Sequence, residues 1–290
     1  MRARRTLLVL VVTACSDGAA APPPPSASST APAPPTADRT RATTILKAQV
    51  ASLRSGDAAL VASFAADAVV LVPDARAAHG ETTGLREAIA RLGPHDTLKD
   101  IRLGKVVADA TPAAVWWSAE LTMVAESREP ESSPHKTETT LRVTELATAD
   151  SGWKVVAGAF AAAARPENRA DPDEIDTAST TAAGPLTPLL ADPAKLELAL
   201  APRAVVFGTD KGEAAWDTAA HALLKKWSKL ALSINGAPRE VRGKGWGFAI
   251  ANVDWKQPKE KSPARMAALV IATPTTVGGW QVVAAQYTAY

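Results

Sequence analysis

RAVVFGTDKGEAAWDTAAHALLKKW, residues 203–227, is the stretch that decides the fold of the C-terminal half of the chain. Its opening residues, 203–207, include a run of apolar and β-branched side chains, which predicts a strand. Glycine and aspartate then mark a turn. Apolar residues recur three and four positions apart in the rest of the stretch, which predicts a helix over Trp216–Trp227 with one buried face.

The neighbouring segments extend this pattern in both directions. A helix is predicted over Asp192–Leu200, because Leu196 and Leu200 lie four positions apart and aspartate suits a helix start. Beyond the helix at 216–227, β-branched and aromatic residues predict three further strands. These strands are Trp246–Trp255, Arg265–Thr273 and a closing strand from Trp280 to Tyr287.

The first half of the chain repeats this order of elements. The segment SGDAALVASFAADAVVLVP, residues 55–73, predicts a helix from Asp57 to Phe64 and then a strand at Val69–Leu71. The closing strings GWKVV, residues 152–156, and GGWQVV, residues 278–283, match each other best. The other expected elements are a helix at Leu85–Leu92 and strands at Trp116–Val124 and Thr137–Leu146. Helices followed by strands favour the α+β class with an antiparallel sheet.

These strings and their order resemble the NTF2-like superfamily, and within it the SnoaL-like group. The resemblance covers most of residues 40–164 and 189–290. It implies two tandem cone-shaped domains, each a curved antiparallel sheet wrapped around helices and enclosing an apolar pocket. Some members of the family are isomerases, cyclases or hydrolases, whereas others are ligand-binding or dimerisation modules without catalytic activity.

The N-terminal residues resemble an export signal. Three arginines lie within the first five residues, and the apolar run Leu7–Val12 follows. The string Val12-Thr13-Ala14-Cys15 resembles the lipobox of bacterial lipoproteins, in which the cysteine is lipidated and becomes the new N-terminus. An ordinary cleaved signal is the alternative. We therefore expect an envelope lipoprotein, anchored to a membrane through Cys15 and facing the periplasm or the cell exterior.

Composition divides the chain into five parts. A Pro/Ala/Ser-rich tether follows the signal, and a polar, charged stretch separates the two repeats, as expected for a linker. The expected parts are a signal peptide (1–14), a tether with lipidated Cys15 (15–39), a first NTF2-like domain (40–164), a linker (165–188) and a second NTF2-like domain (189–290).

Several classes of function are disfavoured by composition. The net charge of +2 gives no general argument for nucleic-acid binding. The single cysteine excludes a disulfide or a CxxC pair within the chain. No run of apolar residues after position 15 is long enough to span a membrane. The four histidines are scattered, no phosphate- or dinucleotide-binding motif occurs, and we expect neither a metal nor a cofactor.

Four residues are weak candidates for acid–base chemistry. Glu120 lies on the strand at 116–124 but alternates away from the apolar face, Asp210 and Glu213 flank a turn, and His221 borders the buried face of a helix. A solvated or structural role is the alternative for each. The expected pocket-lining residues are Trp117, Met123, Trp216 and Trp246.

Two functions remain open at this point. The first is a non-catalytic scaffold that binds a small apolar ligand or an envelope protein. The alternative is an isomerase- or cyclase-like enzyme that uses a buried acid or histidine in an apolar pocket. We also expect the two domains to pack as an intramolecular pseudo-dimer through Trp116, Phe248 and Ile250, because such a face would promote association if left bare.

Overall fold

The computed structural model describes residues 39–55, 59–72, 75–79, 97–126, 136–163, 184–210, 212–256 and 264–289. The signal peptide, the tether with Cys15, the helix expected at 85–92 and most of the expected linker lie outside the described residues. No helix in the described ranges is both long enough and apolar enough to cross a membrane.

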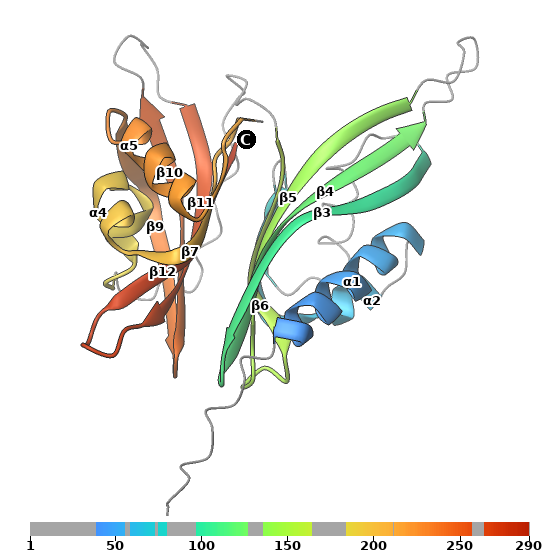
Figure 1. The fold of residues 1–290 in the computed structure, drawn as a ribbon, viewed down its shortest axis with the longest axis horizontal. Coiled ribbons are helices and arrows are strands. Elements are labelled where there is room, and N and C mark those ends of the chain that lie inside the picture. The colour runs from blue at the N-terminus through green and yellow to red at the C-terminus, as the bar shows by residue number, and fades with distance from the viewer. Residues whose placement is uncertain are drawn as a thin grey trace, which may run out of the picture. The chain divides into compact units, whose positions relative to one another are not determined.

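The first sheet has six strands in the order β2-β1-β6-β5-β4-β3. One of its faces is covered by two helices, α1 and α2 (Figure 1). The elements are α1 (Arg39–Ser55), α2 (Ala59–Ala62), β1 (Phe64–Val72), β2 (Ala75–His79), β3 (Thr97–Thr111), β4 (Ala114–Glu126), β5 (Lys136–Thr148) and β6 (Lys154–Ala162).

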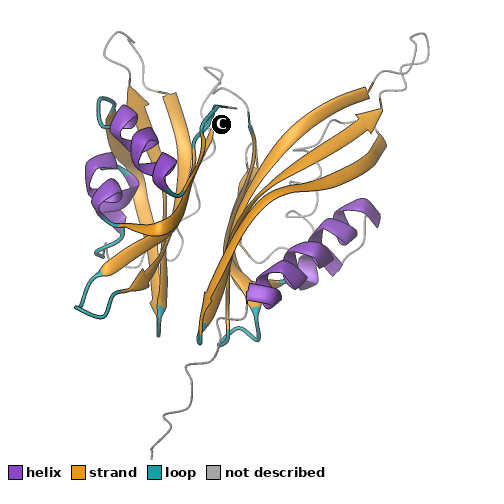
Figure 2. Ribbon diagram, in the orientation of Figure 1, coloured by secondary structure: helices purple, strands orange, loops and turns teal. Residues whose placement is uncertain are grey.

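The second sheet has the same strand order, β8-β7-β12-β11-β10-β9, and carries its helices on one face as well (Figure 2). Its elements are the 3₁₀ helix η1 (Thr187–Leu190), α4 (Pro193–Leu198), β7 (Leu200–Phe207), β8 (Ala214–Trp216), α5 (Thr218–Trp227), β9 (Ala231–Gly243), β10 (Trp246–Lys256), β11 (Ala264–Pro274) and β12 (Trp280–Ala289).

Strands dominate the described chain, and both sheets are mixed. β1 pairs with β6 in parallel, as β7 does with β12, while the other neighbours are antiparallel. The expected α+β class, with each antiparallel sheet wrapped around helices, is therefore wrong. The helices lie on one face of each sheet, and the strands outnumber them because each sheet has two strands that the sequence pattern did not reveal.

The strands missed by the sequence pattern lie at the sheet edges. β3 is rich in charged residues, and its apolar alternation changes parity between Leu103 and Val106, where the pairing to β4 is irregular. β9 contains the turn-like string Asn-Gly-Ala-Pro at 235–238. This string coincides with an irregularity in the pairing to β10, where Gly236 has a φ of 80°. Edge strands tolerate such bulges and prolines because one side of the strand is unpaired.

Each sheet builds one core with its own helices. In the first sheet, apolar residues of α1 and α2, such as Leu46 and Leu60, pack against Trp117 of β4. In the second sheet, η1, α4 and α5 contribute residues such as Leu196 and Leu224. Trp153, immediately before β6, and Trp280, the first residue of β12, are partly buried and pack against these two cores. They thus have similar places in the two halves.

A third core lies between the two sheets, on the faces that carry no helices. It joins Val69, Leu71 and Trp116 of the first sheet to Phe248 and Ile250 of the second. The Trp246 and Phe248 rings stack with 6.4 Å between centroids. Both faces of each sheet are therefore covered, one by helices and the other by the opposite sheet.

Glu240 attaches the segment before η1 to the edge strand β9. Its Oε2 accepts hydrogen bonds from the backbone N–H groups of Gly184, Leu186 and Thr187 and from the Thr187 hydroxyl, at 2.8–3.1 Å. Arg242 approaches the other carboxylate oxygen at 3.3 Å. These hydrogen bonds hold Leu186, Leu189 and Leu190 against the core of the second sheet.

Phe248→Ala tests the core between the sheets. Removing a fully buried phenylalanine typically lowers the free energy of unfolding by about 3–5 kcal/mol, because apolar contacts are lost and a cavity remains. Val277→Ala, at a side chain that is 92% exposed, should change it by less than about 0.5 kcal/mol. Chemical denaturation measures both. Equal, small effects of the two substitutions would show that the sheets do not pack through Phe248.

Candidate functional site

A buried carboxyl group lies in the core between α1 and the first sheet. Glu145 of β5 is 0% exposed, and its Oε1 accepts a hydrogen bond from Nε2 of Gln49 on α1 at 3.0 Å. The same Gln49 nitrogen donates to Ser63 Oγ at 3.1 Å. The Ser63 hydroxyl in turn donates to the carbonyl oxygen of Leu60. The carboxyl group is therefore held by a chain of polar contacts that starts at the end of α2.

The sheet leaves room for this carboxyl group at a glycine. In the strand pairing, Glu145 lies opposite Trp117 of β4 on one side and Gly158 of β6 on the other. A Cβ atom at position 158 would lie 3.3 Å from Glu145 Cγ, tighter than ordinary van der Waals contact. A larger residue at this position would therefore crowd the carboxylate side chain.

Burial keeps the carboxyl group of Glu145 neutral at pH 7. Loss of hydration raises its pKa from the ordinary 4.5 to about 8, and the nearby donors of Gln49 and Trp117 oppose this rise only in part. A neutral carboxyl group has one O–H donor as well as an acceptor oxygen. Glu145 can therefore donate a hydrogen bond or exchange a proton near neutral pH.

Two oxygen atoms at this site, Glu145 Oε2 and Gln49 Oε1, lack hydrogen-bond partners among the described residues. The Trp117 indole N–H makes no hydrogen bond of ordinary geometry with a described residue, but it faces the Glu145 carboxyl closely enough to favour the ionised form. Buried polar groups without partners are costly, so native proteins pair nearly all of them with protein groups, water or ligands. We refer to these three side chains as the Glu145 cluster.

The second sheet has no polar group at the corresponding place. Val270 of β11 precedes an irregularity in the β11–β12 pairing by the same interval at which Glu145 precedes the one in β5–β6. Val270 lies opposite Ala249 and Ala285, where Glu145 lies opposite Trp117 and Gly158. The second sheet packs an apolar side chain at this position. The carboxyl group of Glu145 is therefore not needed to form this kind of sheet.

Of the candidates from the sequence, Glu120 and Asp210 meet at a different site, between the sheets. Arg142 of β5 is 1% exposed and points away from the Glu145 cluster. It pairs with Glu120 at 3.4 Å and donates to the carbonyl oxygens of Gly208 and Asp210 at 2.8 Å. Gln286 donates to the Arg142 carbonyl oxygen at 3.2 Å. Burial lowers the pKa of Arg142, against the influence of nearby carboxylates.

Glu213 stabilises the turn that Arg142 contacts. Its carboxylate accepts from Trp227 Nε1 at 3.1 Å and from Lys226 at 3.2 Å, and its Oε2 lies 3.4 Å from the Asp210 nitrogen. Both carboxylate oxygens of Glu213 therefore face donor groups of neighbouring residues. His221, by contrast, is part-exposed and lies 3.5 Å from Glu197, apart from the other candidates.

The expected pocket-lining residues divide between different environments. Trp117 and Met123 lie in the core of the first sheet, together with the face of Glu145. Trp246 lies between the sheets instead. Trp216 belongs to strand β8 rather than to the helix expected there, and the Lys105 ammonium lies 4.5 Å from its ring. The strand ends there because the chain turns sharply at Asp217, whose φ is 54°.

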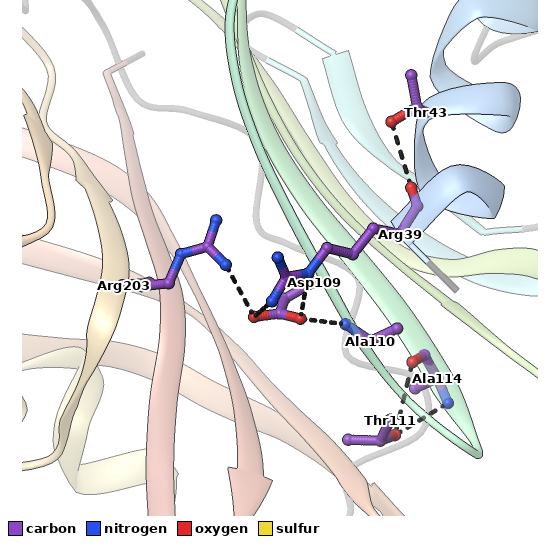
Figure 3. Close-up of polar contacts among 7 residues, drawn as sticks. All are labelled: Arg39, Thr43, Asp109, Ala110, Thr111, Ala114 and Arg203. Atoms are coloured by element: carbon purple, nitrogen blue, oxygen red, sulfur yellow. Dashed lines mark hydrogen bonds and ion pairs between the residues drawn. The ribbon is translucent and has the colours of Figure 1, made fainter. Parts of the chain in front are cut away.

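A surface ion-pair cluster also joins the two sheets (Figure 3). Asp109 of β3 accepts from Arg39 Nε at the start of α1 at 3.0 Å, and Arg203 of β7 lies 3.6 Å away. The Asp109 carboxylate also accepts from the Ala110 nitrogen at 3.0 Å. These side chains are partly exposed, so their contribution to stability is small.

The sequence reasoning missed Glu145 and Gln49. A signal for Glu145 exists: Leu141, Val143 and Ala147 share its parity on β5 and all lie in the first core. A charged residue at the third position of such an apolar alternation indicates a carboxyl group that faces inward. Within the part of the chain that the structure describes, no group of three or more His, Cys, Asp or Glu could hold a metal ion.

Glu145→Gln tests the buried acid through the pH dependence of stability. Between about pH 4.5 and 8 the carboxyl ionises only in the unfolded chain, so the free energy of unfolding falls as pH rises. The limiting slope is roughly 1.4 kcal/mol per pH unit, it levels off above about pH 8, and below pH 4.5 the effect is absent. Glu145→Gln should remove this slope in denaturation curves. Glu138→Gln, at a 58% exposed position of the same strand, should retain it. An unchanged slope in Glu145→Gln would contradict the burial of the acid.

Comparison with known proteins yields remote structural similarity only. No family model matches the chain, and no curated protein matches it. An NTF2-like protein of unknown function from Pseudomonas putida is 14% identical, with a TM-score of 0.30, over 34% of this chain and 73% of that one. A ketosteroid isomerase-like protein from Erwinia carotovora atroseptica is 18% identical, with a TM-score of 0.27, over 34% and 82%. A putative polyketide cyclase from Xanthomonas campestris is 15% identical, with a TM-score of 0.31, over 42% and 90%. TM-scores of this size do not establish a shared fold or function.

Proposed function

We propose that this chain is an envelope lipoprotein whose first half binds a small neutral molecule at the Glu145 cluster. The observation that carries the proposal is the pair of buried oxygen atoms, Glu145 Oε2 and Gln49 Oε1, that have no described partner. A bound molecule that supplies hydrogen bonds to them would offset their desolvation cost. The surrounding core is apolar, so the rest of such a molecule would be apolar too.

We propose further that the two halves are NTF2-like copies of the SnoaL-like group that form an intramolecular pseudo-dimer. The identical strand order of the two sheets supports this proposal. Trp116, Phe248 and Ile250 belong to the core between the sheets, and Arg142 contributes polar contacts at the same interface. Val270 stands where the first half has its buried acid, so the proposed ligand site belongs to the first half alone.

The alternative function is proton-transfer catalysis of the isomerase or cyclase kind. It is favoured by the pKa of Glu145, which at about 8 suits a group that gives or takes a proton near neutral pH. Binding without turnover remains our conclusion, since the cluster's other members, Gln49 and Trp117, do not exchange protons at neutral pH. Glu145→Gln separates the two functions: it keeps a hydrogen-bond donor for binding but removes the exchangeable acid proton.

Binding can be detected at the Trp117 indole N–H. Titration of the ¹⁵N-labelled full chain with cyclohexanone, a small neutral probe, should shift the Trp117 indole resonance, because this indole lies beside the Glu145 carboxyl at the proposed site. The Trp227 indole, which already donates to Glu213, should not shift and serves as the internal control. Glu145→Val, which copies the residue at the corresponding place of the second sheet, should weaken binding about tenfold. Shifts that are equal at all indoles, or absent, would refute the binding site.

The lipid anchor is a separate proposal, supported by the lipobox-like string that ends at Cys15. Two or more acyl chains anchor a protein stably, because each buried CH₂ contributes about 0.8 kcal/mol. Cys15→Ala should therefore move the protein from the membrane fraction to the soluble fraction. Fractionation followed by immunoblotting measures this, with Ser16→Ala as a matched control that stays in the membrane. Membrane retention of Cys15→Ala would rule the anchor out.

A further inference from the structure

Two equivalent positions in the two sheets carry opposite charges. Both β1 and β7 pair in parallel with the closing strand of their own sheet, and both pairings have the same irregularity in register. In these pairings Phe64 of β1 has the place that Leu200 has in β7. Asp67 follows Phe64 by the same number of residues as Arg203 follows Leu200. The first half therefore has an acid where the second half has a base.

Each of these two side chains meets an opposite charge on an edge strand of the other sheet. Arg203 Nη1 lies 3.6 Å from the carboxylate of Asp109 on β3 (Figure 3). Asp67 lies close to Arg239 of β9, because its carboxylate opposes the fall in the pKa of Arg239 that burial causes. Arg39 also contacts Asp109, but it belongs to the same half and is therefore present whichever half lies opposite.

The charges on the edge strands lie near equivalent places and face the other sheet. Asp109 pairs with Trp116 of β4, and Arg239 pairs with Ile250 of β10. Both partner residues belong to the core between the sheets. In the second sheet Val241 has the place of Asp109, and it lies two positions from Arg239. Two positions span about 7 Å along a strand, which is less than the Debye length of about 8 Å at physiological ionic strength.

We infer that these charges make the contact between the sheets selective for unlike halves, so that each half accepts the other half of the chain and rejects a second copy of itself. If another first half replaced the second half, its Asp67 would lie where Arg203 lies, against Asp109. If another second half replaced the first half, its Arg203 would lie against Arg239. Such a pairing of like halves has twofold symmetry, so each repulsion would occur twice.

The apolar part of the contact does not provide this selectivity. Trp116 and Phe248 have equivalent places in β4 and β10, and both belong to the core between the sheets. Hydrophobic attraction is non-directional, so a second copy of either face would also be attracted. Specificity is a difference between two affinities, and unfavourable contacts with the wrong partner are a common source of it. Ion pairs that add little stability can therefore still decide which faces pair.

Arg142 adds a second asymmetry between the halves. In the register that relates β5 to β11, its equivalent is Ala267, which packs in the core between the sheets. Two second halves would therefore lack the cation that binds the carbonyl oxygens of Gly208 and Asp210. The buried contacts of Arg142 and the ion pairs at the rim favour the same unlike pairing.

The full chain allows the cost of a like pairing to be measured without separating the halves. Arg203→Asp combined with Arg239→Asp gives the second half acidic charges like those of the first. At low salt we expect the folding equilibrium constant to fall about tenfold, because two attractions between the halves become repulsions. Chemical denaturation measures this constant.

Asp67→Arg then provides the decisive comparison. In the parent chain it places a second cation beside Arg239 and should lower the folding constant about threefold. In the Arg203→Asp/Arg239→Asp chain it restores an attraction and should raise the constant about threefold. A purely structural effect of the substitution would have the same sign in both chains. In about 1 M NaCl both effects should shrink, because the Debye length falls to about 3 Å.

The exchanged pair Asp67→Arg/Arg239→Asp keeps the test decisive even if the acidic chain does not fold. It retains an attraction between the halves, so its folding constant should lie close to that of the parent chain. A loss equal to the combined losses of the two single substitutions would overturn the selectivity, because the two charges would then act independently.

Lys195→Asp combined with Lys229→Asp is the matched control. It causes the same change in net charge at two exposed lysines of the second half, one on α4 and one just after α5. In this chain Asp67→Arg should remain destabilising. Opposite signs of the Asp67→Arg effect in the parent and acidic chains would establish the selectivity, and equal signs would overturn it. Either result concerns the proposed pairing of the halves and leaves the proposed ligand site at the Glu145 cluster untouched.

Discussion

The rest of the structure depends on the apolar contact between the two sheets. Each sheet has two faces, and its helices reach only one of them. The other face of the first sheet carries Val69, Leu71 and Trp116, which would promote aggregation if exposed. Packing against the second sheet covers this face and buries the matching residues of β10 and β11. β5, which holds both polar sites, contributes Leu146 to this contact.

Polar groups inside this contact carry a cost that the structure meets locally. Arg142 loses its hydration, and an unpaired buried guanidinium would be strongly destabilising. Two backbone carbonyl oxygens and Glu120 take the place of water around it. The carbonyl oxygens belong to the turn after β7 in the second sheet. Arg142, on β5 of the first sheet, therefore holds that turn in place. A well-packed apolar residue could give similar stability, but it would not hold the turn in one position.

The sequence predicted the parts of the fold with strong periodicity and missed the parts without it. The strands with aromatic and β-branched residues, β4, β10 and the closing strands β6 and β12, lie where they were expected. The edge strands β3 and β9 were missed because charge and turn-forming residues hide them. The mixed topology was also not predicted, because parallel pairing depends on contacts between residues distant in the sequence, such as Val70 and Gly158.

The candidate site was less predictable for a similar reason. Glu120 and Asp210 stood out as acids near apolar segments, yet Glu120 pairs with Arg142 and Asp210 contacts it through its backbone carbonyl oxygen, and the sequence alone did not connect Arg142 to either. Glu145 acquires its character from Gln49, 96 positions away in the sequence, and from the depth of the core. The alternation along β5 indicates that Glu145 points into the core of the first sheet. Its hydrogen bond with Gln49 is visible only in the tertiary structure.

The spacing of Arg142 and Glu145 on β5 makes this strand intolerant of changes in length. The two residues are three positions apart, so they project from opposite faces of the sheet, one toward the second sheet and the other toward α1. Insertion or deletion of a single residue between them would place both on the same face. A guanidinium would then enter the helix-side core, or a carboxyl group would face the apolar layer between the sheets. Divergence of this protein should therefore proceed by substitution within β5 and by insertions only beyond its ends.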